Sequence, residues 1–161
     1  MTRPKICIIG AGCSGFTTAK RLQDYGIPFD IFEASDNIGG NWYYNNPNGM
    51  SACYQSLHID TSKWRLAFED YPVPADWPDY PHHAQLLQYF HDYVDHFDLR
   101  RHIRFNTRVD TAERQSGRGL CRSYRRVQRR GCRRLTLEGR IFGRHALFDI
   151  AAPASFERLQ R

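Results

Sequence analysis

The sequence predicts an α/β fold that opens with a Rossmann-like βαβ unit. An apolar run at 5–9 ends in the pattern G-x-G-x-x-G, which begins at Gly10. A stretch of helix-compatible composition follows at 16–25, and a second apolar run at 29–33 ends in an acidic residue. A strand, a glycine turn, a helix and another strand in this order are typical of a parallel sheet that binds a dinucleotide.

Each glycine of the first loop has its own expected task. Gly10 permits the tight turn that leaves the strand, and Gly12 lets backbone N–H groups approach a pyrophosphate. Gly15 allows close packing of helix and sheet, so the phosphates lie at the positive end of the helix. Gly26 is expected to end this helix.

The second strand is predicted to end at Glu33, 18 residues after Gly15. At this distance a carboxylate can accept hydrogen bonds from the ribose hydroxyls of a bound adenosine. A carboxylate also repels a 2′-phosphate, so FAD or NAD is favoured over NADP at this site. The alternative is a glycine-rich turn without a ligand, which the surrounding strand–helix–strand context makes the weaker interpretation.

Residues 34–50 have the composition of a loop. The run Gly39-Gly40-Asn41-Trp42 allows close approach of the backbone to a ligand, and the aromatic residues that follow can wall a flat ring system. A turn whose aromatic residues fill the core beneath it is the alternative.

Four further segments complete the first two thirds of the chain. Alternation at 54–63 predicts a short strand that ends in a polar turn. Four prolines within 70–81 exclude a regular element and predict an ordered loop over the sheet, pinned by Trp77 and Tyr80. Apolar spacing predicts a helix over 84–97, and alternation predicts a strand over 103–109. The histidines around this helix are expected to be solvated or to cap it, because their spacing does not suit a metal site; they are His82, His83, His91, His96 and His102.

Composition sets the class of protein. The 161 residues are enough for one domain with a core, the mean hydropathy is −0.64, and no run of 18 apolar residues occurs. Met1 leads within a few residues into the first strand, so we expect no signal peptide, no membrane partner and a cytoplasmic location. The five cysteines form no C-x-x-C pair, which predicts neither a disulfide framework nor a zinc site.

Charge divides the chain in two. Residues 1–110 hold ten basic and thirteen acidic side chains, whereas residues 111–161 hold thirteen arginines, no lysine and four acids. The net charge of +6 therefore comes entirely from the last third.

Several motifs in order resemble one family. They are Gly10–Gly15 as G-A-G-C-S-G, Glu33 after the second strand, Gly39–Trp42 as G-G-N-W, the block S-L-H-I-D-T-S-K at 56–63, and Asp79-Tyr80-Pro81 before a helix. Together they resemble the flavin-containing monooxygenases and, more distantly, their Baeyer–Villiger relatives, over about residues 1–110.

The resemblance implies the FAD-binding portion of a flavoprotein with two dinucleotide-binding domains, in which NADPH reduces the flavin. The reduced flavin then oxygenates a small-molecule substrate at a soft nucleophile such as amine nitrogen or sulfide sulfur. FAD contacts are expected at Gly10, Gly12, Cys13, Ser14, Gly15, Glu33, Gly40 and Trp42, with Asp60 and Thr61 in the flavin–nicotinamide region. No general acid or base is assigned.

The sequence departs from the family at two points. Asp60 stands where many members carry Asn, and a carboxylate cannot donate the amide hydrogen bond. The second glycine-rich loop, which holds NADPH in the family, and the F-x-G-x-x-x-H motif before it do not occur in the chain. We therefore expect an incomplete and inactive fragment.

The tail at 111–161 has three interpretations. It is a nucleic-acid-binding arm on a dinucleotide-binding module, a disordered solvated segment, or GC-rich coding sequence translated out of frame. The last is favoured because such translation produces arginine freely and lysine rarely. One choice of codons for 140–147, read one base later, also encodes Glu-Phe-Ser-Gly-Asp-Thr, which resembles the family's F-x-G segment. No helical or strand period is found here, so an irregular tail is expected and nucleic acid is a disfavoured partner.

Overall fold

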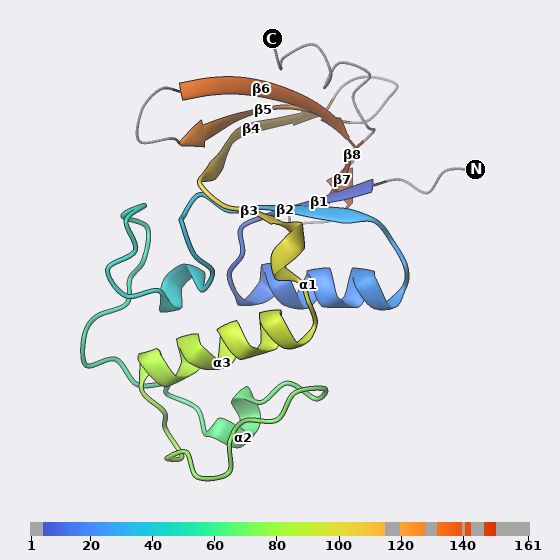
Figure 1. Cartoon of the computed structure of the whole chain (residues 1–161). Coiled ribbons are helices and arrows are strands. Elements are labelled where there is room, and N and C mark those ends of the chain that lie inside the picture. Colours follow the sequence, from blue (N-terminus) through green and yellow to red (C-terminus); the bar gives the residue numbers. More distant parts are fainter. Residues whose placement is uncertain (1–4, 115–119, 128–131, 140, 143–146, 151–161) are drawn as a thin grey trace.

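A mixed five-stranded sheet forms the centre of the molecule (Figure 1). The computed structural model describes residues 5–114, 120–127, 132–139, 141–142 and 147–150, with side chains as far as residue 110. The strand order is β3-β2-β1-β8-β7, and the parallel part consists of β1 (Lys5–Ile9), β2 (Phe29–Phe32) and β3 (Ile103–Arg104). The predicted α/β fold and its opening βαβ unit are confirmed.

Helix α1 (Cys13–Asp24) connects the two central parallel strands. It begins three residues before the predicted start, because Gly12 is already in the extended conformation of an N-cap, with φ −75° and ψ −178°. At the other end Gly26 adopts a left-handed φ of 61°, and the Ile27 N–H donates to the carbonyl of Leu22 at 2.9 Å. Gly26 therefore ends the helix as predicted.

The segment before the second long helix carries little regular structure. It contains the 3₁₀ turn η1 (Gly40–Trp42) and the single-turn helix α2 (Lys63–Leu66), and it leads to α3 (His83–His96). The strand predicted at 54–63 is wrong, because only an isolated bridge pairs His58 with His82. This bridge does not extend into a strand, because His82 is followed at once by His83, the first residue of α3.

The helix predicted at 84–97 is confirmed within one residue. His82 caps it: its Nδ1 accepts from the Ala84 N–H at 3.2 Å, and the Gln85 side chain accepts from the His82 N–H at 3.0 Å. The part of the chain that the structure describes contains no cluster of metal-binding side chains. The capping role expected for these histidines is found at His82, whereas His83 is buried, with 5% of its surface exposed, and so is not solvated as expected.

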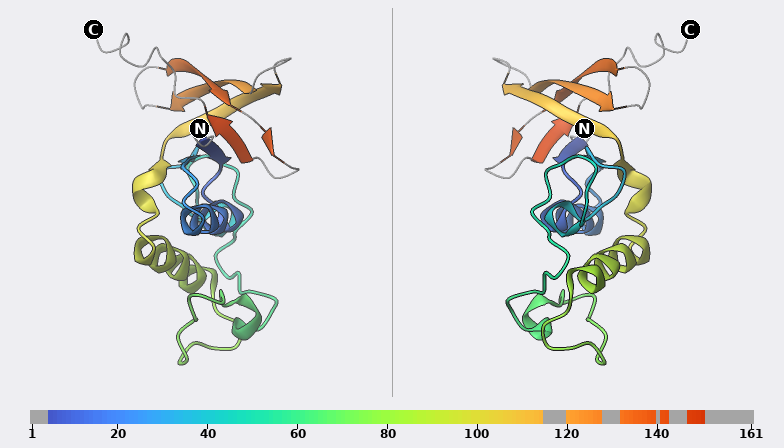
Figure 2. Two further views of the ribbon diagram at one scale, coloured as in Figure 1. Left: turned by 90° about the vertical axis from the view of Figure 1, so that its right-hand side faces the viewer. Right: turned by 90° about the vertical axis from the view of Figure 1, so that its left-hand side faces the viewer.

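The proline-rich segment is irregular, as predicted, but it does not lie over the sheet. Trp77 packs against Tyr89 of α3, with ring centroids 6.1 Å apart. In Figures 1 and 2 this segment and α2 lie beyond α3, on the side away from the sheet. The position follows from the aromatic residues of the segment, which pack against aromatic side chains of α3 such as Tyr89.

The structure after residue 102 differs from two further expectations. The strand predicted at 103–109 is divided by a turn at Asn106, whose φ is 53°, into β3 and β4 (Thr107–Arg114). The tail predicted to be irregular contains β5 (Leu120–Val127), β6 (Cys132–Gly139), β7 (Ile141–Phe142) and β8 (Leu147–Ile150). Antiparallel ladders are made by backbone N–H and C=O groups, so these strands form without the side-chain alternation on which sequence analysis depends.

Strands β4, β5 and β6 form a separate antiparallel sheet, on the opposite side of the central sheet from α1 (Figure 2). Strand β8 pairs antiparallel with the free edge of β1, from Lys5 opposite Ile150 to Ile8 opposite Leu147. None of the described helices has the length and apolar character needed to cross a bilayer.

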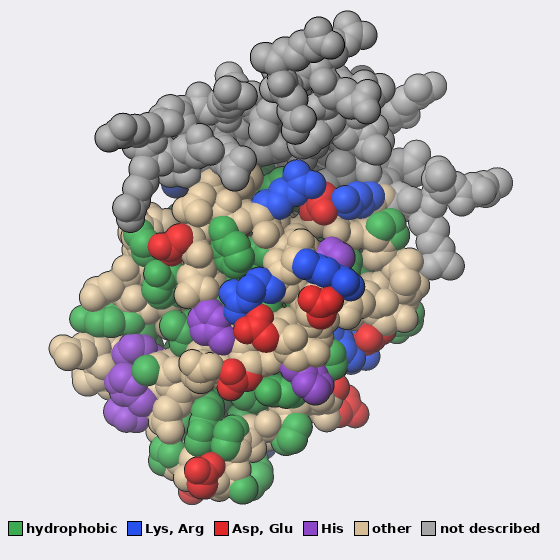
Figure 3. Space-filling view, in the orientation of Figure 1, with side chains coloured by type: hydrophobic (Ala, Val, Ile, Leu, Met, Phe, Trp, Pro, Cys, Tyr) green, Lys and Arg blue, Asp and Glu red, His purple; other side chains and the backbone are tan. Residues whose placement is uncertain are grey.

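Several charges on the described surface form local ion pairs. Figure 3 shows Lys and Arg side chains beside Asp and Glu on the face that it draws. Asp30 joins Lys5 at 2.9 Å and Arg104 at 3.2 Å, and Arg100 joins Asp95 at 2.6 Å. Exposed pairs of this kind contribute at most about 1 kcal/mol each, so burial of apolar side chains remains the main source of stability.

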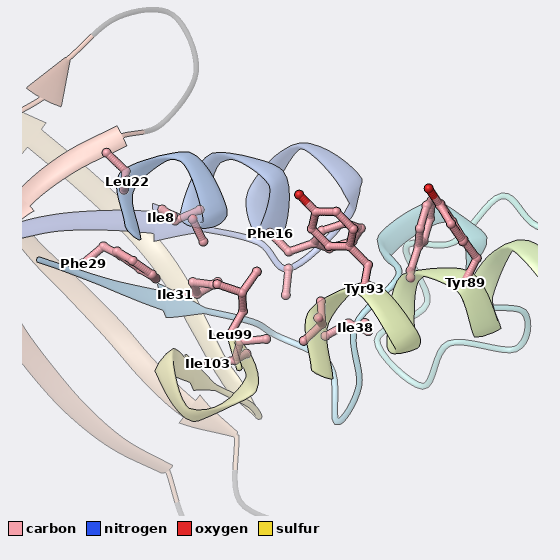
Figure 4. Close-up of a cluster of buried hydrophobic side chains, with 14 of the residues drawn as sticks. Ile8, Phe16, Leu22, Phe29, Ile31, Ile38, Tyr89, Tyr93, Leu99 and Ile103 are labelled. Atoms are coloured by element: carbon pink, nitrogen blue, oxygen red, sulfur yellow. The ribbon is translucent and has the colours of Figure 1, made fainter. Parts of the chain in front are cut away.

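The core lies between the sheet, α1 and α3 (Figure 4). Phe16 of α1 is fully buried and lies between the two halves of this core. Ile31 lies on its sheet side. On its α3 side, the ring centroids of Phe90 and Tyr93 lie 5.1 and 5.6 Å from that of Phe16. Full burial of one such side chain stabilises the fold by about 1.5–3 kcal/mol. This core fixes α1 against the sheet and so positions the loop before it.

Candidate nucleotide-binding site

A pocket of about 320 Å³ opens where β1 and β2 end. Ligands of open parallel sheets bind at this carboxyl edge. The pocket is lined by four of the predicted site residues, Gly10, Gly12, Glu33 and Gly40. The volume lies at the lower end of the range for small-molecule sites and suits part of a dinucleotide rather than all of it.

The first glycine loop has the geometry that its sequence predicts. Gly10 has a φ of 93°, and its N–H donates to the carbonyl of Phe32 at 2.8 Å, which binds the turn to the end of β2. A Cβ on Gly15 would overlap the carbonyl oxygen of Gly10. Helix α1 therefore approaches the turn as closely as it does only because position 15 has no side chain.

The second glycine pair packs against the first loop. The Gly39 N–H donates to the carbonyl of Ala11 at 3.1 Å, and a Cβ on Gly40 would lie 3.2 Å from the Cα of Gly12. Gly39 has a φ of 115°, and a Cβ there would overlap a methyl group of Leu87. The two loops thus form one backbone-lined wall, which only glycines at these positions permit.

Glu33 is buried beside this wall, with 5% of its surface exposed. Its Oε2 accepts from the Ala11 N–H at 2.6 Å, and its Oε1 accepts from the Ser35 N–H at 2.7 Å. The carboxylate is therefore held in place by the glycine loop. Each carboxylate oxygen has a second lone-pair site, so Glu33 can still accept hydrogen bonds from the hydroxyls of a ligand in the pocket that it lines.

Cys13, Ser14 and Gly15 form the first turn of α1. The Gly15 and Phe16 N–H groups both donate to the carbonyl of Gly12, at 2.9 and 3.2 Å. The N–H groups of Cys13 and Ser14 have no partner among the described residues and remain available to an anion at the helix N-terminus. Cys13 itself packs against the core, and burial raises the pKa of its thiol, so its side chain fills space and is not activated.

The structure does not bring the other predicted residues to this pocket. Trp42 is half-buried and packs against the core. Asp60 and Thr61 are exposed and stand just before α2, which lies on the far side of α3 from α1 (Figure 1). Their expected place near the flavin and nicotinamide stays a prediction.

Sequence analysis missed several residues that line the pocket: Asn46, Asn48, Met50, Thr107, Arg108 and Val109. The first three lie in a run of Asn, Pro and Gly, which is ordinary turn composition and carries no sign of a ligand. The last three lie on β4, whose start reaches the pocket because Thr107 donates its N–H to the carbonyl of Glu33 at 2.7 Å. These six residues can be recognised only once it is known how segments that are distant in sequence pair in the fold.

The fold and the site together define a dinucleotide-binding α/β protein. The model of one family, described as "FMO-like: Flavin-binding monooxygenase-like", matches residues 3–129. The chain therefore belongs to the flavin-binding monooxygenase-like family. The match continues beyond residue 110, where the motif resemblance ends.

Individual relatives agree with the family. Flavin-containing monooxygenase 5 of Homo sapiens is 41% identical over 117 residues, which are 71% of this chain and 22% of that protein. Dimethylaniline monooxygenase [N-oxide-forming] 2 of Oryctolagus cuniculus is 37% identical over 113 residues, 69% of this chain and 21% of that protein. Among solved structures, an oxidized steroid monooxygenase bound to NADP has a TM-score of 0.64 at 27% identity, covering 74% of this chain and 23% of that one. The chain thus spans about a fifth of the length of the curated relatives that it matches.

Proposed function

We propose that the chain is the FAD-binding portion of a flavin-dependent monooxygenase that uses FAD and NADPH. The substrate is a small molecule, oxygenated at a soft nucleophile such as amine nitrogen or sulfide sulfur. The observation that carries the proposal is the pocket in which the glycine loop and the buried Glu33 carboxylate meet. The name of the rabbit relative, which includes N-oxide formation, supports the amine class.

The residues of the pocket fit FAD. The N–H groups of Cys13 and Ser14 would hold the pyrophosphate, and the wall made by Gly12 and Gly40 leaves room for it. Glu33 would accept from the ribose hydroxyls, and its buried negative charge would disfavour a 2′-phosphate. When bound, the flavin supplies the redox chemistry that takes reducing equivalents from NADPH and activates oxygen.

We also propose that the tail at 111–161 contains sequence translated from a disrupted reading frame, so that the chain as it stands binds FAD without turning over substrate. A second G-x-G-x-x-G pattern, which would hold NADPH, does not occur in the 161 residues. The thirteen arginines of this segment would then attract nucleic acid only through their charge and would not form a selected binding arm.

Purification of the chain and absorbance spectroscopy test the cofactor. We expect a flavin spectrum after reconstitution with FAD, and FAD in the supernatant after heat release. NADP competing with FAD at equal concentration should not displace it, because of Glu33. A chain that binds NADP and no flavin would overturn the assignment.

A further inference from the structure

One amide side chain of the pocket is buried and only partly satisfied. Asn46 has 7% of its surface exposed, and it lines the pocket together with Glu33 and the glycine loop. Asparagine is seldom this buried unless its polar atoms have partners. The hydrogen bonds of each end of this amide therefore indicate what the side chain does.

The oxygen end is occupied. Oδ1 of Asn46 accepts from the Ser35 hydroxyl at 2.9 Å and from the Asn48 backbone N–H at 3.0 Å. A backbone N–H can only donate, so the atom that faces Asn48 must be the oxygen, which fixes the orientation of the amide. The nitrogen, Nδ2, is therefore the other end of the side chain.

The nitrogen end has no partner within the described residues. Both hydrogen bonds of the Asn46 side chain use Oδ1. Nδ2 is not among the fully buried polar atoms without a partner, so water or a ligand in the adjoining pocket can supply its acceptor. The amide thus has two donor hydrogens left for a group in the pocket that Asn46 and Glu33 both line.

The neighbours of Asn46 hold it in this position. The Ser35 N–H donates to Oε1 of Glu33 at 2.7 Å, and the Ser35 hydroxyl accepts from Nδ2 of Asn48 at 2.6 Å. The carbonyl of Ser35 accepts from the Asn106 N–H at 2.8 Å. Ser35 therefore connects Asn46 with Glu33 and with the turn before β4, so the amide is preorganised before any ligand binds.

We propose that Asn46 is a ligand-binding residue for the adenosine half of the dinucleotide, with Nδ2 donating to an acceptor atom of the adenosine. The inference rests on the proposed function and extends it. Glu33 offers only acceptors and Asn46 offers only donors, so the pair is complementary to an adenosine. The ribose hydroxyls can donate to Glu33, while the adenine ring nitrogens can accept from Asn46.

Titration calorimetry of the whole chain with AMP and with FAD tests the proposal. Asn46→Asp keeps the shape and the acceptor of the side chain but replaces the donor by a negatively charged oxygen. We expect affinity for both ligands to fall at least about tenfold, as for a buried hydrogen bond to a ligand that is lost. The matched control is Asn45→Asp, because Asn45 is exposed, does not line the pocket and has a φ of 54°, which Asp tolerates.

A second measurement uses the unmodified chain and so does not depend on how the variant folds. In nitrogen-15 NMR, the side-chain amide signal of Asn46 should shift on addition of AMP, whereas the signal of Asn45 should not. Unchanged AMP affinity in folded Asn46→Asp, or an Asn46 signal that AMP does not move, would overturn the inference while leaving FAD binding intact. An unmodified chain that binds neither AMP nor FAD would overturn the proposed function and this inference together.

Discussion

Residues 5–110 and the described strands after them are held together differently. In the first region, side-chain pattern and backbone agree. The buried positions of β1, α1 and α3 are mostly apolar, Gly10 has a φ of 93°, and a Cβ on Gly15 or Gly39 would overlap a neighbouring atom. In the second region the order that the structure describes is that of the backbone ladder. When local sequence preference, apolar pattern and packing all favour the same structure, the sequence has been selected for that fold.

The register of the second sheet makes the difference concrete. Arg125 of β5 stands opposite Arg108 of β4 and opposite Arg134 of β6, and Arg126 stands opposite Arg133. Like charges directly opposite each other destabilise an antiparallel pair. A sheet shaped by selection avoids such rows, so the register supports the proposal that the C-terminal third is read from the wrong frame.

The largest expected effect comes from changing that frame. A single-base repair of the gene near the codon for Gly117 should restore a longer chain with a second glycine-rich loop. NADPH oxidation, which we expect to be absent from the present chain, should then be measurable at 340 nm together with peroxide or oxygenated product.

The alternative for the same region predicts a different result. If the tail is a functional basic arm, resequencing should find an uninterrupted frame, and the chain should bind particular nucleic-acid sequences tightly. On our proposal, duplex binding is weak and indifferent to sequence. The logarithm of the affinity should fall linearly with the logarithm of the salt concentration, with a slope of about −0.9 for each phosphate contacted.

The next effect separates two glycines of the ordered region. Gly15→Ala should prevent normal folding, because the new Cβ would overlap the Gly10 carbonyl and neither backbone segment can move away. Gly12→Ala should fold, since its Cβ would lie 3.7 Å from Gly40, an ordinary contact, but it would narrow the pyrophosphate cradle. Circular dichroism and FAD retention measure the two outcomes, and a folded Gly15→Ala chain with full flavin content would contradict the assigned packing.

These glycines also show what a sequence can predict. The roles of Gly10 and Gly15 follow from local spacing, because a strand, a turn and a helix that are adjacent in sequence must be adjacent in space. Glu33 was predicted for the same reason, as the end of the neighbouring parallel strand. The backbone contact between Gly12 and Gly40 joins segments 28 residues apart and was predicted only as an approach to a ligand.

Other parts of the molecule depend on long-range register. Asn46 and Asn48, which form one wall of the pocket, lie in a segment with the composition of an ordinary turn. The neighbouring sequence does not indicate that their side chains form hydrogen bonds with Ser35. The strand expected around Leu57 and Ile59 shows the opposite failure. Its alternation is real, since Ile59 is buried in the core, but the Ile59 N–H donates to the carbonyl of Pro81 and the segment joins no sheet.

A moderate effect is expected at Lys63, a buried residue of α2 with 4% of its surface exposed. Its ammonium group donates to the carbonyls of Ala75, at 2.7 Å, and of Trp77, and so fastens the proline-rich segment to α2. Lys63→Met keeps the aliphatic volume but leaves both carbonyls unpaired. The free energy of unfolding should fall by about 2 kcal/mol, measured by urea denaturation.

Arg65→Met is the matched control for this change, because Arg65 lies on the same short helix and is exposed. Its free energy of unfolding should stay within about 0.5 kcal/mol of that of the unmodified chain. Equal losses in the two variants would mean that the bonds of Lys63 do not order the segment.

The smallest effect concerns Tyr93 of α3, and it appears only in alkali. Burial raises the pKa of its hydroxyl from 10.0 to about 12, with nearby Asp70 adding to the shift. Between these two values the unfolded chain has released a proton that the folded chain still holds, so stability is complete below the lower value and falls as pH rises towards the upper one. Tyr93→Phe removes this proton and should flatten the decline in unfolding free energy between about pH 10 and pH 12. It should change little at neutral pH, because the hydroxyl makes no hydrogen bond with described residues. Tyr80→Phe, at a side chain that is 56% exposed, is the control and should leave the alkaline slope unchanged. Identical slopes in Tyr93→Phe and the unmodified chain would show that the ordered region does not close over α3 as the structure has it.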